Sequence, residues 1–180
     1  IRLLLRSSRD GFDALFELAR LVVQGGAGFS GDLRRFFAAA RLVALAKPAG
    51  GVRPIAVGSA WRRAIGRAVT AQCSSEWAAL LAPTQFGVGV RGGCELLVHG
   101  LRRLLELHPD WVVVGTDIRN AYNSLSRGAM LRALAADFPA LVPMARFFYE
   151  RPPDVHYAHE GGIAAIAAQS GGQQGDPLLP

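Results

Sequence analysis

Asp117 is the residue whose setting most directly indicates chemistry in this chain. It follows the apolar run 111–116, which has the composition of a buried strand. A carboxylate at the end of such a strand is well placed to bind a catalytic Mg²⁺ or Mn²⁺ ion, because these cations prefer oxygen ligands. An aspartate at a strand end is also a common structural cap, so its position alone leaves both roles open.

The residues after Asp117 have types that suit a bound nucleotide. Tyr122 could lay its ring against a sugar, where its bulk would exclude a 2′-hydroxyl and favour deoxyribose. The backbone N–H groups of Arg119, Asn120 and Ala121 could point at phosphate oxygens as an anion nest. The alternatives are a core aromatic on a turn and an ordinary turn, since such nests are frequent.

Two cations flank a short loop nearer the N-terminus. The segments 42–46 and 52–57 are predicted to pair as a hairpin, which places Lys47 and Arg53 on opposite sides of its loop. An Arg fork and a Lys point charge would together suit the triphosphate of a nucleotide. Two solvated loop charges are the alternative.

Two further groups have residue types that suit nucleic acid. Gly175 would let the backbone approach a base pair closely, and the amide of Gln174 could donate to a sugar or phosphate oxygen. Arg62, Arg63 and Arg67 cluster on about one helical face and could bind template or primer phosphates. A polar loop and a solvated helix face are the alternatives.

The composition is compatible with one substantial domain or two small lobes, and it favours a polyanionic partner. With 180 residues, 51% of them hydrophobic, the chain can bury a real core. The net charge is +6, and a basic domain attracts polyanions. The sequence contains no uninterrupted apolar run long enough to span a membrane, so no membrane partner is expected. It also carries no targeting signal, and the expected compartment is the nucleus or the cytoplasm.

Common enzyme motifs of other classes are missing from the sequence. Cys73, Cys94 and the four His residues do not have zinc-ligand spacing. No phosphate-binding Gly-Lys loop, serine nucleophile elbow or His-Glu-x-x-His pair occurs, which disfavours those classes.

Hydrophobic periodicity predicts a helix-rich chain with two hairpins. Pro54 restricts its strand to a sheet edge or a bulge, and Ser30 and Ser126 are expected to cap helices. A second hairpin is predicted around residues 160–162. The predicted helices cover 10–23, 30–40, 60–81, 94–108, 126–138 and 139–149.

The order of four motifs along the chain resembles a reverse transcriptase of the non-LTR (LINE-type) retrotransposon kind. The resemblance spans roughly residues 42 to 180, and its motifs are Lys47-Pro48 with Arg53-Pro54-Ile55, Gln85-Phe86-Gly87-Val88, Asp117-Ile118-Arg119-Asn120-Ala121-Tyr122-Asn123-Ser124 and Gln174-Gly175-Asp176-Pro177-Leu178-Leu179-Pro180.

The resemblance implies an α/β (α+β) fold, namely the fingers and the N-terminal part of the palm of a right-hand polymerase. Residues 1–41 would be an N-terminal helical segment leading into the fingers. Residues 42–110 would form the fingers, with the nucleotide-contacting hairpin, and residues 111–180 a partial palm.

The resemblance also implies roles for individual residues. Asp117 would be the first catalytic aspartate, and the backbone carbonyl of Ile118 would join it on Mg²⁺ or Mn²⁺. Tyr122 would select the sugar, and Gln174 and Gly175 would line the nucleotide pocket. The enzyme would use deoxynucleoside triphosphates to add deoxynucleotides to the 3′-hydroxyl of a DNA primer on an RNA template by two-metal catalysis.

One departure from the family pattern affects the expected activity. The family's aromatic-Ala-Asp-Asp hairpin should follow the Gln-Gly motif, yet none of the fourteen acidic residues is adjacent to another. We therefore expect a fragment that ends before this hairpin and lacks polymerase activity by itself. The alternatives are a non-catalytic nucleic-acid-binding remnant of a decayed retroelement and a relative of RNA-directed RNA polymerases, for which the bulky Tyr122 is unfavourable.

Overall fold

The structure is a computed structural model that describes residues 9–179. Residues 1–8 of the expected N-terminal segment and Pro180 of the last motif lie outside the described residues. The described chain combines helices with one four-stranded sheet, so the expected mixed α+β class is confirmed. Within these residues no helix has the length and hydropathy that crossing a membrane would require.

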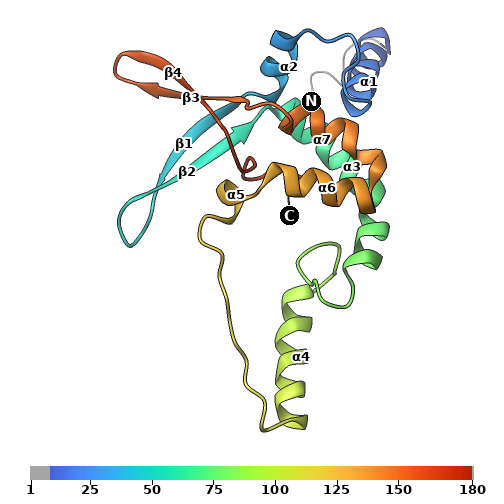
Figure 1. Cartoon of the computed structure of the whole chain (residues 1–180), viewed down its shortest axis with the longest axis vertical. Helices are drawn as coiled ribbons and strands as arrows, with labels where there is room; N and C mark the ends of the chain where they lie inside the picture. Colours follow the sequence, from blue (N-terminus) through green and yellow to red (C-terminus); the bar gives the residue numbers. More distant parts are fainter. Residues whose placement is uncertain (1–8, 180) are drawn as a thin grey trace.

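The sheet consists of two antiparallel hairpins joined by a short parallel seam (Figure 1). Only Ala40 and Arg41 of the first hairpin pair with the second hairpin, opposite Val155 and His156. Both predicted hairpins are confirmed, and Pro54 lies on an edge strand as expected. In the order β2-β1-β3-β4, the strands are β1 (Ala40–Ala46), β2 (Val52–Gly58), β3 (Asp154–His159) and β4 (Gly162–Ala167).

Most predicted helices form, with ends close to those expected. The hydroxyls of Ser30 and Ser126 each accept a hydrogen bond from the backbone N–H three residues on, which confirms both as N-caps. The helices are α1 (Arg9–Val23), α2 (Gly31–Ala38), α3 (Ala60–Leu81), α4 (Gly93–Leu107), α5 (Ala121–Ser124), α6 (Arg127–Asp137), the 3₁₀ turn η2 (Pro139–Leu141) and α7 (Val142–Tyr149).

Helix α7 is the centre of the hydrophobic core. Five of its eight residues are buried, since it is apolar on nearly every side. Val22 of α1, Ala38 of α2 and Ile65 of α3 pack around it. The ring of Phe29 meets the edge of the Phe147 ring, with centroids 5.7 Å apart. We call the elements that pack around α7, together with the sheet, the body.

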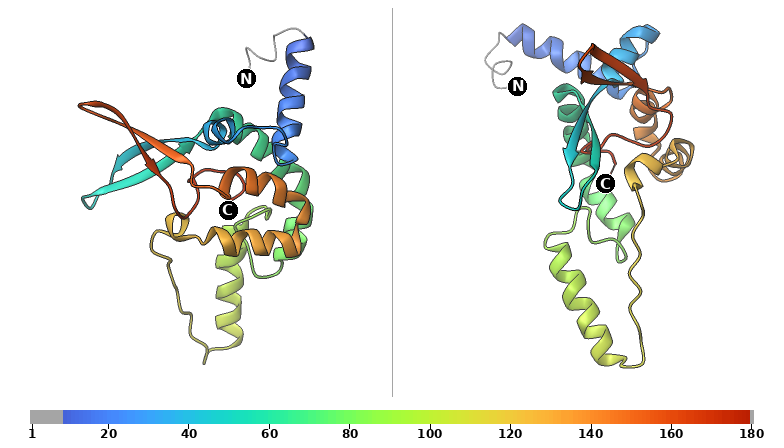
Figure 2. Two further views of the ribbon diagram at one scale, coloured as in Figure 1. Left: turned by 45° about the horizontal axis from the view of Figure 1, so that its top comes forward. Right: turned by 90° about the vertical axis from the view of Figure 1, so that its left-hand side faces the viewer.

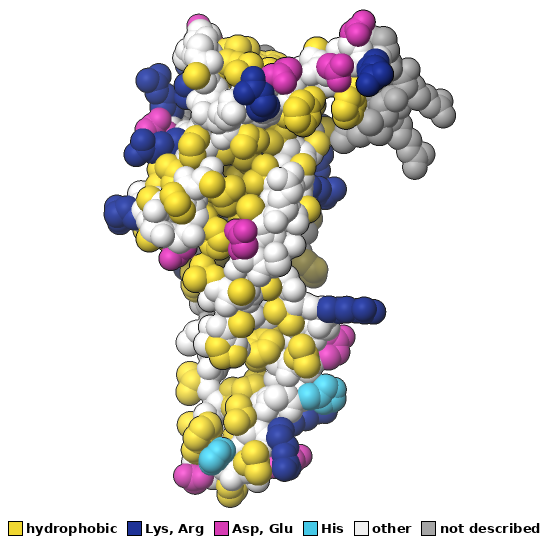
Figure 3. Space-filling view, turned by 90° about the vertical axis from the view of Figure 1, so that its right-hand side faces the viewer, with side chains coloured by type: hydrophobic (Ala, Val, Ile, Leu, Met, Phe, Trp, Pro, Cys, Tyr) yellow, Lys and Arg dark blue, Asp and Glu magenta, His cyan; other side chains and the backbone are white. Residues whose placement is uncertain are grey.

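A long arm extends away from the body (Figure 2). It consists of α4 and the segment 108–120, which returns toward α5. Gly93 is the only buried residue of α4, and hydrophobic side chains lie exposed along the arm, at the lower end of Figure 3. His108 stacks on Trp111, with ring centroids 4.1 Å apart, where the arm turns back.

The predicted strand 111–116 does not form, and this expectation was wrong. The segment has no regular secondary structure, and Val112 is 85% exposed. An apolar run predicts a strand only if a neighbouring strand supplies hydrogen bonds and covers its side chains. No segment of the described sheet pairs with residues 111–116.

Candidate nucleotide site

Two segments far apart in sequence meet beneath the sheet. The backbone N–H of Gly172 donates to the carbonyl of Tyr122 at 2.8 Å, and that of Gly171 donates to the carbonyl of Leu125 at 3.0 Å. The Ser170 hydroxyl donates to the carbonyl of Asn123 at 3.3 Å. The structure therefore joins the residues that follow Asp117 to those that precede Gln174.

Gly171 makes this close approach possible. Its φ of +71° lies in the left-handed region, and an added Cβ would come within 2.6 Å of the Asn123 Cα atom. Arg127 holds the same turn from the other side, because its Nε donates to the carbonyl of Gly171 at 2.8 Å and its Nη2 to that of Ser170 at 3.3 Å.

A small cavity lies where these segments face the sheet. Its volume is about 170 Å³, and its polar lining includes Asn123, Arg127, Gly171 and Gln173. Its apolar lining comes from the two hairpins, through Leu42, Pro54, Ala56, Val155 and Ile166. Burial is the main cause that lowers the pKa of the Arg127 guanidinium. The cavity thus combines one cation and several polar groups with an apolar wall.

A buried ionic network fixes the turn of the last motif. The Nε of Arg62 donates to Oδ2 of Asp176 at 3.0 Å, and the Tyr149 hydroxyl donates to the same oxygen. The Arg62 guanidinium also lies over the rings of Phe148 and Tyr149, 4.3 Å and 4.8 Å from their centroids. We call Arg62, Tyr149 and Asp176 the clamp. Burial raises the pKa of Tyr149 above its ordinary value, so its hydroxyl stays a protonated donor to higher pH than an exposed tyrosine would.

The prediction that Arg62 binds nucleic acid is wrong in this structure. Arg62 is 2% exposed, and its guanidinium is paired with Asp176, so it cannot reach a phosphate outside. Arg63 and Arg67 lie on the exposed side of α3, and their role remains a prediction. Helical spacing placed the three side chains near one face, but it gave no sign of the buried carboxylate contributed by Asp176.

Gln173, which lies just before the last motif and was not predicted as a site residue, is buried. Its Nε2 donates to the Ala38 carbonyl at 2.9 Å, next to the start of β1, whereas its Oε1 has no hydrogen-bond partner. Gln174 is half-buried, and Gly175 is exposed with a φ of +81°. Two adjacent glutamines precede Gly175 in the sequence, and nothing local distinguishes which of them is buried.

The two hairpin cations lie far out on the β1–β2 tip. The tip projects from the body, and both Lys47 and Arg53 are exposed there (Figure 1). The cavity is lined instead by residues nearer the base of this hairpin, such as Leu42 and Ala56. The predicted placement of the cations beside the loop is confirmed, while their contact with a triphosphate stays a prediction.

The predicted anion nest lies at the start of α5. Asn120 has a φ of 55° and is the N-cap residue, and Arg119, Asn120 and Ala121 are all exposed. The Tyr122 side chain is 39% exposed, so it is not a core aromatic. These residues are open to a ligand from solvent.

The described residues do not form a two-metal site by themselves. Asp117 is exposed in the arm, and Ile118 beside it is 72% exposed. From Arg9 to Leu179 no group of three or more His, Cys, Asp or Glu side chains is arranged to hold a metal ion. Asp176 lies in the last motif, but the clamp occupies its Oδ2 atom and the Leu178 N–H its Oδ1 atom. Nothing in the described residues tests the metal-ligand roles of Asp117 and Ile118, which stay predictions.

Comparison with protein-family models found no match, and a search of curated proteins found none with significant similarity.

Proposed function

We propose that this chain forms part of an RNA-directed DNA polymerase, with fingers in residues 42–110 and part of the palm in residues 111–180. The observation that carries the proposal is the cavity beneath the sheet. The cavity is lined by Asn123, which belongs to the motif that begins at Asp117, and by Gln173, which precedes the motif at Gln174. The base of the hairpin that carries Lys47 and Arg53 completes the lining. A nucleotide site of a polymerase needs contributions from these same three regions, by resemblance to the family.

The contacts at Tyr122 support a sugar-selecting role. Its carbonyl accepts from Gly172, so the turn that precedes Gln174 sets the position of the Tyr122 backbone. Its ring remains partly exposed, where a sugar could lie against it. Replacing it by a small residue would open space for a 2′-hydroxyl.

Electrostatics support an anionic substrate. Lys47, Arg53 and Arg119 are exposed and form no ion pair with another described residue, so their charges are free for phosphate. Arg127 adds a partly buried cation at the cavity. In this proposal the chain's own residues bind and orient the nucleotide and its triphosphate.

Primer extension on an RNA template tests the proposal. The natural full-length polypeptide that carries this sequence should add deoxynucleotides to a DNA primer, and Asp117→Asn should abolish extension while template–primer binding persists. Tyr122→Ala should raise the use of ribonucleotides relative to deoxynucleotides, with Tyr157→Ala on β3 as a matched control. The 180 residues alone are expected to be inactive, since no group of three or more His, Cys, Asp or Glu side chains within residues 9–179 is arranged to hold a metal ion.

Other outcomes would contradict the proposal. Equal use of ribo- and deoxynucleotides by the wild-type protein would favour an RNA-directed RNA polymerase. Salt-sensitive nucleic-acid binding without extension by the full-length protein would favour the non-catalytic alternative.

A further inference from the structure

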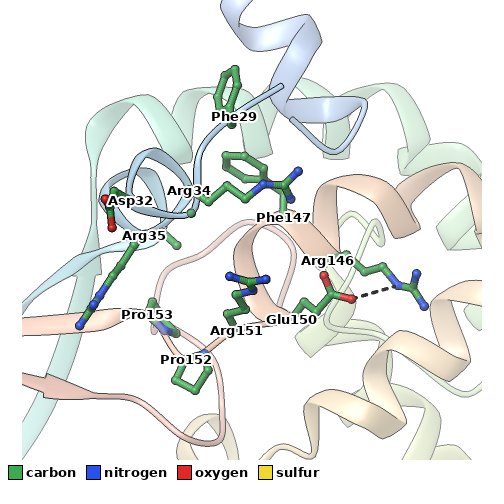
Figure 4. Close-up of a pocket in the computed structure, with 12 residues that line it drawn as sticks. Phe29, Asp32, Arg34, Arg35, Arg146, Phe147, Glu150, Arg151, Pro152 and Pro153 are labelled. Atoms are coloured by element: carbon green, nitrogen blue, oxygen red, sulfur yellow. Dashed lines mark ion pairs between the residues drawn. The ribbon is translucent and has the colours of Figure 1, made fainter. Parts of the chain in front are cut away.

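A basic cleft lies between α2 and α7, outside the candidate nucleotide site (Figure 4). Its volume is about 620 Å³. Four arginines line it, Arg34 and Arg35 from α2, Arg146 from α7 and Arg151 just beyond α7, against two carboxylates, those of Asp32 and Glu150. None of these residues was singled out for binding in the sequence, because α2 and α7 are separated by more than a hundred residues.

The four guanidinium groups differ in how far they are already engaged. Arg35 forms a two-pronged pair with Asp154 and leans out along the rim. The Nη2 atom of Arg34 donates to the Gly26 carbonyl at 2.9 Å, and its guanidinium lies over the Phe147 ring, 5.5 Å from the ring centroid. These contacts hold the side chain in place, while its remaining N–H groups can donate to a ligand. Arg35 is therefore occupied, whereas Arg34 is a fixed donor.

The remaining two cations are free or loosely held. Arg151 is exposed, forms no ion pair with a described residue, and directs its guanidinium into the space between α2 and α7. Arg146 lies at the rim and faces Glu150 at 4.0 Å, a distance at which an exposed pair contributes little. Both can turn to an incoming anion without breaking a strong contact.

The position of the cleft favours a nucleic-acid strand over a small ion as its ligand. Pro153 lines both this cleft and the cavity beneath the sheet, so the two spaces are neighbours. A ligand that occupies both must be long and carry anionic groups at intervals. Guanidinium forks match phosphate oxygens, and released counterions favour binding of a polyanion.

We infer that the cleft between α2 and α7 binds backbone phosphates of a nucleic-acid strand that passes the candidate nucleotide site. The inference rests on the nucleic-acid partner of the proposed function, but it does not depend on polymerase chemistry. Arg151 and Arg146 contact phosphate, and Arg34 provides a fixed donor. The carboxylate of Glu150 competes with phosphate for Arg146 and weakens binding of the nucleic acid.

Two charge-matched double variants of the full-length polypeptide test this inference. Arg146→Gln with Arg151→Gln removes the free cations of the cleft, and Arg91→Gln with Arg102→Gln removes two exposed cations at and near α4. Fluorescence anisotropy with a labelled single-stranded RNA measures affinity between about 50 and 200 mM salt. The cleft variant should bind at least about tenfold more weakly, with a salt slope shallower by roughly 0.7 per lost phosphate contact. The control should keep the wild-type affinity and slope.

Glu150→Gln provides a test in the opposite direction. Removing this carboxylate should tighten RNA binding, because it no longer competes with phosphate for Arg146. This variant also keeps the inference testable if the double cleft variant fails to fold, which circular dichroism would reveal.

Several results would overturn the inference. Equal weakening in the cleft and control pairs would show general charge attraction only, and unchanged or weaker binding by Glu150→Gln would exclude this carboxylate from the site. Displacement of the RNA by inorganic phosphate at matched ionic strength would assign the cleft to a free anion. Failure of the proposed function is a separate result, since the cleft variants can lose RNA binding whether or not the wild-type protein extends a primer.

Discussion

The body around α7 and the arm are both rich in apolar side chains, yet only the body buries them. In the body, Phe148 and Met144 are each 1% exposed. In the arm, Val114 is 79% exposed and Leu107 is 56% exposed. The difference teaches that hydrophobic sequence becomes core only where other elements supply a matching surface, and in the body α1, α2, α3 and α6 do so for α7.

Substitutions in the clamp are expected to show the largest difference in stability between the body and the arm. Asp176→Ala would leave the Arg62 charge buried without a partner, and such a change costs about 3–5 kcal/mol of unfolding free energy. Asp110→Ala, at an exposed position in the arm, should change the free energy by less than about 0.5 kcal/mol. Urea unfolding measures both, and similar losses in the two variants would contradict the role of the clamp.

Two glycines extend the comparison to the backbone. Gly171→Ala introduces a Cβ at a positive φ against the backbone of Asn123, which should destabilise the fold by about 1–3 kcal/mol. Gly115→Ala in the arm meets no atom within 4 Å and should be nearly neutral. Thermal unfolding followed by circular dichroism distinguishes them. A neutral Gly171→Ala would mean that the contact with residues 122–125 is not formed in solution.

The change of folding stability at alkaline pH is the smallest expected effect, and it arises from Tyr149 in the body. Because folding raises the pKa of Tyr149, its contribution to stability is fully present below the pKa of an unfolded tyrosine, about 10, and is lost as pH rises above that value. Urea unfolding between about pH 8 and 11 should therefore show stability falling at the alkaline end. Tyr149→Phe should fall less steeply, and an identical decline in both proteins would exclude Tyr149 as its source.

Local patterns predicted the parts of the fold that depend on neighbouring residues. Ser30 and Ser126 cap helices because their hydroxyls bond within their own turn, and Pro54 lies at an edge because it lacks a donor. The run 111–116 was predicted wrongly, since the same composition serves a buried strand and an exposed extended segment. Its state depends on a partner that no local pattern specifies.

The candidate site was predictable only in outline. The motifs at Tyr122 and Gln174 were recognised, but their meeting through Gly171 and Gly172 depends on contacts between segments almost fifty residues apart. The clamp was missed for the same reason, because Arg62 and Asp176 are separated by 114 residues. Burial of Arg62 rather than Arg63 or Arg67 follows from where α7 packs.

The short seam between the two hairpins gives the β1–β2 hairpin the mechanics of a lever. Beyond Arg41 no cross-strand bond to β3 restrains it, so its tip at Lys47 is carried about 20 Å from the seam, at about 3.3 Å per residue. A rotation of about 15° at the seam would move the tip by roughly 5 Å on this lever arm. The distance between the tip cations and the cavity therefore depends on the angle that the hairpin makes with β3 at these two residue pairs.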